Sequence, residues 1–144
     1  MRTGVESILG EKRIAVVGVS RGKGFGNAAL QTLRERGWQA FPVNAAADAI
    51  EGERCFHSIG ELPELPGAVL AVVPPAQTEK VVDECLRLGV QKLWMQQGAE
   101  SDAAIRKAEA GGMTVVHHAC ILMYARPRGV HRFHAFVQRL FGKL

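Results

Sequence analysis

The residues best suited to chemistry form a glycine-rich segment that follows an apolar run near the start of the chain. In "RIAVVGVSRGKGFG", residues 13–26, the apolar stretch leads into four glycines, a serine and two cations. A glycine at the end of a strand lets a ligand approach the backbone, and loop amides together with a helix N-terminus attract an anion. Ser20 adds a hydroxyl, and Arg21 and Lys23 add charge for phosphate oxygens. The segment predicts a site for a nucleotide or another phosphorylated ligand, although a tight turn with solvated cations would use the same residue types.

Two common phosphate-binding motifs do not fit this segment. A Walker loop needs serine or threonine after its lysine, whereas Lys23 is followed by Gly24. The hexapeptide "GFGNAA", residues 24–29, has the glycine spacing of a dinucleotide fingerprint but begins six residues beyond the apolar run. Asn44 stands where an NAD-binding enzyme usually has an acidic residue. These departures argue against NAD, which stays open as an alternative ligand.

The elements that must position this loop alternate between strand and helix. Apolar, β-branched runs typical of buried parallel strands occur at residues 13–18, 39–43, 68–73, 92–96 and 113–117. Helical patterns follow three of them, at residues 27–36, 77–88 and 101–110. Each ends near a glycine suited to a left-handed C-cap, namely Gly37, Gly89 and Gly111. Repeated βαβ units predict one α/β domain over residues 1–144: a doubly wound, mainly parallel five-stranded sheet with helices on both faces.

Two segments fall outside this repeat. Residues 44–67 carry two prolines and predict a short extra strand near Cys55 and Phe56 with one helical turn. The tail predicts a basic amphipathic helix at about residues 128–142, with apolar residues on one side and arginines on the other. Its apolar side would pack on the domain or on a second copy in a homodimer. A nucleic-acid-binding regulator that uses the basic side remains an alternative function.

The strand-end motifs, taken in order, resemble a known family. "AVVGVS", "FPVN", "VVPPAQT" and "LWMQQGAES" close the first four strands, and a cysteine follows the fifth. This order resembles the small stand-alone CoA-binding domains, which are related to the N-terminal domain of the succinyl-CoA synthetase α subunit. The resemblance covers roughly residues 8–124. It implies a Rossmann-like fold that binds coenzyme A or an acyl-CoA, without the catalytic partner domains of the synthetase.

The resemblance also implies where each part of coenzyme A would bind. The residues implied at the phosphates are Gly18, Val19, Ser20, Arg21 and Lys23. Those implied near the ribose phosphate and adenine are Pro42, Val43 and Asn44, with Val73 and Pro74 as a wall for adenine or pantetheine. Those implied at the pantetheine end are Gln97 and Gly98, with Cys120 close to the thiol. All of them lie where predicted strands end.

Two adjacent histidines, His117 and His118, precede Cys120 and depart from the family's usual residues. Imidazoles and a thiolate can bind zinc or copper. Because successive strand residues point to opposite faces, we expect the two histidines to face apart and predict no metal site. Cys120 is one of three cysteines without C-x-x-C spacing, which predicts reduced thiols rather than disulfides.

Composition and motifs bound the function further. The net charge of +4 favours an anionic partner, and the longest apolar run, residues 67–76, is too short to cross a membrane. A cytoplasmic protein is therefore expected. Recognised catalytic motifs are missing, and Glu100 and Asp102 are interpreted as the start of a helix. The sequence favours a non-catalytic CoA binder, sensor or regulator in acyl-CoA metabolism over the alternatives of an NAD(P)-binding or acyl-CoA-transforming enzyme and a redox sensor.

Overall fold

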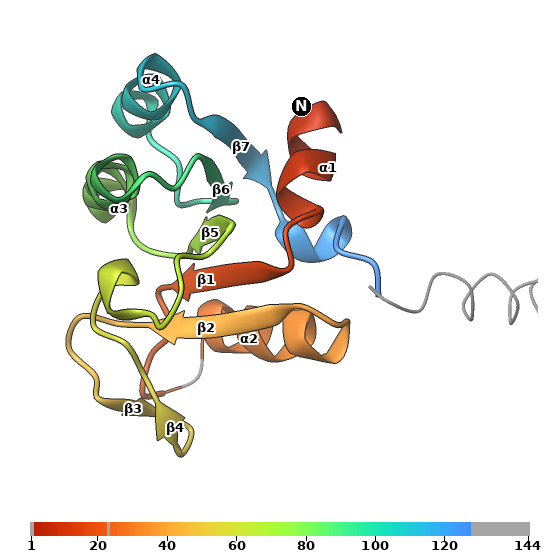
Figure 1. The fold of residues 1–144 in the computed structure, drawn as a ribbon, viewed down its shortest axis with the longest axis vertical. Helices are drawn as coiled ribbons and strands as arrows, with labels where there is room; N and C mark the ends of the chain where they lie inside the picture. Colours follow the sequence, from red (N-terminus) through yellow and green to blue (C-terminus); the bar gives the residue numbers. More distant parts are fainter. Residues whose placement is uncertain (1, 23, 128–144) are drawn as a thin grey trace, which may run out of the picture.

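The fold is a five-stranded parallel sheet, as the sequence predicts. A computed structural model describes residues 2–22 and 24–127, so Lys23 and the predicted helix at about 128–142 lie outside the described residues. The strands run in the order β2-β1-β5-β6-β7 (Figure 1). Their bounds are β1 Arg13–Val17, β2 Gln39–Val43, β5 Ala68–Ala71, β6 Lys92–Gln96 and β7 Thr114–Ala119. All four pairings between neighbouring strands are parallel.

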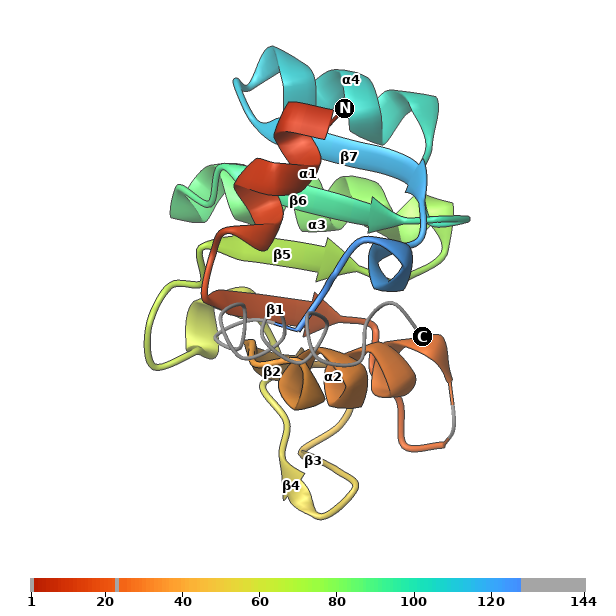
Figure 2. The same ribbon diagram turned by 90° about the vertical axis from the view of Figure 1, so that its right-hand side faces the viewer.

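Helices cover both faces of the sheet. In Figure 2 the strands all point the same way, with α1 (Arg2–Leu9) and α2 (Phe25–Glu35) in front and α3 (Pro75–Leu88) and α4 (Asp102–Ala110) behind. Successive residues of β1 point to opposite faces of the sheet. Ile14 packs in the core with α1 and α2, whereas Ala15 packs in the core with α3 and α4. The sequence reasoning did not include α1, which contacts β6 and β7. No helix within the described ranges is long and apolar enough to cross a membrane.

The predicted glycine C-caps are correct at two helices and wrong at the third. Gly37 and Gly89 follow α2 and α3 with φ of 105° and 85°. Gly111 has φ of −84°, and the left-handed residue is Gly112, with φ of 82°. The helical turn extends through Gly111, whose amide donates to the Lys107 and Ala108 carbonyls, so the chain reverses one residue later. Local sequence does not distinguish two adjacent glycines, because either can adopt positive φ.

The connection from β2 to β5 is a small hairpin followed by a helical turn. Strands β3 (Ala49–Ile50) and β4 (Glu53–Arg54) pair antiparallel, and η1 (Ile59–Glu61) is a single 3₁₀ turn. The helical turn is confirmed. The extra strand expected near Cys55 and Phe56 lies just before them, and Phe56 forms only an isolated parallel bridge with Val43. This bridge holds the connection against the end of β2.

The start of α2 packs directly against the end of β1. A Cβ atom added at Gly26 would lie 2.5 Å from the Gly18 carbonyl oxygen, far inside contact distance. A Cβ atom at Gly24 would meet nothing nearer than the Ser20 hydroxyl at 3.6 Å, and the φ of −173° at Gly24 suits any residue. Gly26 is therefore required by close packing, whereas Gly24 is not.

We predict that Gly26→Ala lowers the free energy of unfolding by about 1–3 kcal/mol, because the new methyl group must displace backbone atoms. The matched variant Gly24→Ala should change it by less than about 0.5 kcal/mol. Urea denaturation followed by circular dichroism measures both values. Equal effects of the two substitutions would contradict the packing argument.

Candidate ligand site at the carboxyl edge of the sheet

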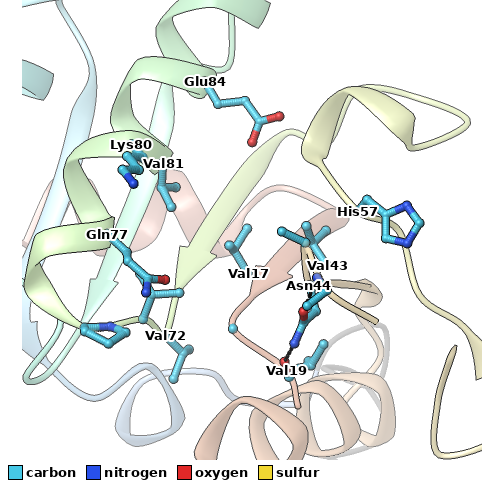
Figure 3. Close-up of a pocket in the computed structure, with 15 residues that line it drawn as sticks. Val17, Val19, Val43, Asn44, His57, Val72, Gln77, Lys80, Val81 and Glu84 are labelled. Atoms are coloured by element: carbon cyan, nitrogen blue, oxygen red, sulfur yellow. Dashed lines mark hydrogen bonds between the residues drawn. The ribbon is translucent and has the colours of Figure 1, made fainter. Parts of the chain in front are cut away.

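A pocket of about 540 Å³ opens at the carboxyl edge of the sheet, where the segments that follow the neighbouring strands β1 and β5 turn in opposite directions (Figure 3). From β1 the chain passes through α2 to β2 on one side, whereas from β5 it continues to β6 and β7 on the other. Open α/β sheets bind ligands at this kind of topological switch point. The residues that line it are Val17, Gly18, Val19, Val43, Asn44, Ala45, Ala46, His57, Val72, Val73, Pro74, Gln77, Lys80, Val81 and Glu84.

The part of the pocket closest to the sheet is lined by apolar side chains and by the backbone of Gly18. Val17 and Val43 come from the ends of β1 and β2, and Val81 comes from α3. Gly18, with φ of 121°, lies so close to β5 that an added Cβ atom would fall 1.9 Å from the Val72 carbonyl oxygen. Only glycine fits this position, because it tolerates the positive φ and has no Cβ atom to clash with Val72. The resulting surface suits a flat, weakly polar ring.

Two helices begin at this edge of the sheet without a side-chain cap: α3 begins at the pocket, and α2 begins next to Gly18, which lines it. Gly24 and Pro74 occupy the N-cap positions of α2 and α3, and neither supplies a capping hydrogen bond. By contrast, α4 is capped by Ser101, whose hydroxyl accepts from the Ala104 amide at 3.0 Å. The first amide groups of a helix and its dipole favour an anion. The start of α2 and the start of α3 are therefore suited to phosphate groups.

Asn44 and Arg21 join the loop after β1 to the loop after β2. The Asn44 amide donates to the Val19 carbonyl at 2.7 Å and accepts from the Ala46 amide at 2.7 Å. The Arg21 guanidinium donates to the Ala46 carbonyl at 2.6 Å. Both polar atoms of the Asn44 side chain are thus used within the protein. Asn44 positions the pocket loops, and a ligand would meet loops that are already held together.

The structure brings together some of the predicted site residues and separates others. Those that line the pocket are Gly18, Val19, Val43, Asn44, Val73 and Pro74. Those that do not are Ser20, Arg21, Pro42, Gln97, Gly98 and Cys120, while Lys23 lies outside the described residues. Pro42 is buried in β2, where its carbonyl accepts from the Phe56 amide. Gln97, Gly98 and Cys120 follow β6 and β7, further along the same edge of the sheet.

One wall of the pocket was missed by sequence reasoning. Gln77, Lys80 and Glu84 face the pocket from α3, at the spacing that places residues on one side of a helix. His57 lies after β4, and its Nε2 atom is 2.7 Å from an Asp48 carboxylate oxygen. The polar positions of α3 carried a signal, because they flank the apolar stripe. His57 carried none, since its place depends on how the β2–β5 connection folds.

The predicted orientation of the two histidines is wrong. Their Nδ1 atoms lie 2.6 Å apart, so His117 and His118 face each other. A register shift between β6 and β7 and a φ of 58° at His118 break the alternation of the strand. Glu100 holds this distortion by accepting from the amides of Gly98 and His118, and α4 begins only at Asp102. Across residues 2–22 and 24–127, no group of three or more potential ligands could hold a metal ion.

All three cysteines are free thiols that differ in environment. Burial, and to a smaller extent the nearby Glu84 carboxylate, raise the pKa of the Cys85 thiol to about 12. Burial also raises the pKa of Cys55. Both therefore stay protonated near neutral pH and are poor nucleophiles. Cys120 is partly exposed, which leaves it the most accessible of the three.

The comparisons with known proteins identify the family. The sequence profile described as "CoA binding domain" matches residues 12–126. The chain belongs to this family of CoA-binding domains. The matched region includes all five sheet strands and the pocket, and omits α1 and the tail. The five-motif resemblance found in the sequence is thereby confirmed.

Curated relatives are ADP-forming acetate–CoA ligases. The chain is 30% identical over 81 residues to the enzyme from Methanocaldococcus jannaschii. This matched region covers 56% of this chain and 12% of the relative. It is 29% identical over 106 residues to ligase I of Archaeoglobus fulgidus, covering 73% of this chain and 16% of the relative. The chain thus spans less than a fifth of either enzyme, and corresponds to their CoA-binding region.

This chain is similar to solved structures of small proteins along nearly the whole length of those proteins. A conserved hypothetical protein from Pyrococcus furiosus has a TM-score of 0.73 at 37% identity, covering 78% of this chain and 97% of that one. A hypothetical protein from Pyrococcus horikoshii has a TM-score of 0.79 at 26% identity, covering 86% and 89%. An acetyl-coenzyme A synthetase from Candidatus Korarchaeum cryptofilum has a TM-score of 0.65 at 26% identity, covering 77% and 27%. The domain thus occurs both in small proteins and inside large synthetases.

We predict that Asn44→Ala lowers the free energy of unfolding by about 1–2 kcal/mol, because it removes one hydrogen bond between the pocket loops and one within the loop after β2. As a control, Gln31→Ala removes an exposed amide on α2 and should change it by less than about 0.5 kcal/mol. Chemical denaturation measures both. A variant Asn44→Ala as stable as the unmodified protein would show that the loops do not depend on this side chain.

Proposed function

We propose that this protein binds coenzyme A, with the nucleotide part of the ligand in the pocket between β1, β2 and α3. The observation that carries the proposal is the pocket itself, an apolar surface beside two uncapped helix N-termini at the topological switch point. Membership of the CoA-binding domain family supports the choice of ligand.

The residues present fit the parts of coenzyme A. The diphosphate would lie at Gly18 and the start of α2, where backbone amides and the helix dipole favour anions. The adenine ring would lie on the valine surface formed by Val17 and Val43. The pantetheine arm would extend along the carboxyl edge toward Gln97 and Cys120, past β5 and β6.

The role proposed for the complex is binding, as in a sensor, carrier or regulator of acyl-CoA, rather than catalysis. The pocket lining is dominated by valine, alanine and glycine, and its imidazole, His57, is directed toward the carboxylates of Asp48 and Glu61. The two least exposed thiols have raised pKa values, which argues against a redox sensor based on Cys55 or Cys85.

We expect coenzyme A to raise the melting temperature of the protein, and NAD at the same concentration to raise it less. A ligand that binds only the folded state stabilises it by an amount set by its concentration and affinity, about 2.7 kcal/mol at one hundred times the dissociation constant. Differential scanning fluorimetry over a concentration series measures the shift. Equal or larger stabilisation by NAD would reject coenzyme A as the preferred ligand.

We also propose that Arg21 and Lys23 bind the ribose 3′-phosphate. Replacing both with alanine should then weaken the binding of coenzyme A about 10-fold or more while changing that of dephospho-CoA little, since a charge-assisted hydrogen bond contributes about 1.5–3 kcal/mol. Isothermal titration calorimetry of both ligands gives the ratio. If the double variant keeps the preference for coenzyme A over dephospho-CoA, the 3′-phosphate binds another cation, such as Lys80, which lines the pocket.

A further inference from the structure

The wall of the pocket formed by α3 changes in chemistry with depth. The helix starts at the carboxyl edge of the sheet and runs away from it, so Gln77 lies near the edge and Glu84 lies about 10 Å further along the helix axis. Lys80 lies between them. An amide, a cation and an anion thus follow one another from the edge into the pocket. Starting from the proposed binding of coenzyme A, this order indicates which part of the ligand each would meet.

Glu84 is the unusual member of this wall. Its side chain is only 19% exposed although it is charged. Its ion-pair partner is Arg87, at 3.7 Å, and that arginine is 68% exposed. Figure 3 shows the Glu84 carboxylate directed from α3 toward the side of the pocket on which Val17 and Val43 lie. A largely desolvated carboxylate beside an apolar surface favours a ligand that offers an N–H donor.

The phosphate groups of coenzyme A are not suited to this position, because they would lie beside a like charge whose side chain is only 19% exposed. The places suited to phosphate are the helix N-termini at the edge of the sheet, on the opposite end of the wall. The N–H donors of coenzyme A are the exocyclic amino group of adenine and the amides of pantetheine. Because the pantetheine arm is expected to extend along the edge toward β6 and β7, the base is the group left for the deep part of the pocket.

We propose that Glu84 selects adenine among nucleobases by accepting a hydrogen bond from its exocyclic amino group. Hypoxanthine and guanine carry a carbonyl oxygen at that position, which would face the carboxylate oxygen and leave both acceptors unpaired. A site built to bond a polar group discriminates strongly against a ligand that lacks it. Glu84 would thus be a specificity-determining residue of the pocket.

The test compares coenzyme A with its hypoxanthine analogue, in which the adenine amino group is replaced by a carbonyl oxygen. The unmodified protein should bind coenzyme A roughly 10- to 100-fold more tightly than the analogue, the range expected for a hydrogen bond to a charged group. Glu84→Gln keeps the size of the side chain and adds an N–H donor that matches the carbonyl oxygen. In this variant the preference should fall to less than 3-fold, partly through improved binding of the analogue. Isothermal titration calorimetry measures all four affinities.

Glu79→Gln is the matched control on the same helix. Glu79 pairs with Lys107 at 3.1 Å and does not line the pocket, so this variant should keep the preference of the unmodified protein. Because each variant is judged by the ratio of two ligands, a general loss of stability does not imitate the result. The role of Glu84 would be overturned if the unmodified protein did not prefer coenzyme A to the hypoxanthine analogue. It would also be overturned if Glu84→Gln kept that preference. Failure of the unmodified protein to bind either ligand would instead reject the proposed function from which the inference starts.

Discussion

The close approach of three backbone segments at the end of β1 is the constraint on which the site depends. Gly18 passes against the Val72 carbonyl after β5, and Gly26 at the start of α2 passes against the Gly18 carbonyl. Neither contact leaves room for a Cβ atom. These contacts fix the two points where the chain leaves the sheet in opposite directions. The pocket exists because the segments diverge there, and the N-termini of α2 and α3 are brought to it by the same contacts.

A second set of interactions converts this divergence into a defined pocket. Asn44 and Arg21 tie the loop after β1 to the loop after β2, while Phe56 bridges to the end of β2. These contacts lie at the carboxyl edge, and those of Asn44 and Arg21 are hydrogen bonds from side chains to loop carbonyls. A loop ordered before the ligand arrives reduces the entropy lost on binding. The pocket is therefore positioned by the sheet and shaped by polar contacts between its loops.

The distribution of charge around the pocket divides it into regions for different chemical groups. Uncapped helix N-termini lie at the edge of the sheet, valines cover the surface next to it, and the Glu84 carboxylate lies deeper along α3. An elongated ligand with an anionic centre and a neutral aromatic end is complementary to this order. Coenzyme A has that form, with its thiol arm leaving the diphosphate in the other direction. The region that matches the curated ligases makes up 12% and 16% of their lengths.

The sequence by itself determined the sheet, its parallel strands, the helices on both faces and the glycine loop. These follow from apolar runs, helical periodicity and glycine positions, which act over a few residues and are visible in one segment at a time. The family was also evident, because several strand ends carried their motifs in order.

Only the tertiary structure decided that His57 and the polar side of α3 reach the pocket, that Asn44 is used between loops, and that His117 turns toward His118. In each case the outcome depends on which distant segments meet, on a register shift or on a loop path. Even the polar side of α3, whose spacing is visible in the sequence, needs the fold to place it at the pocket.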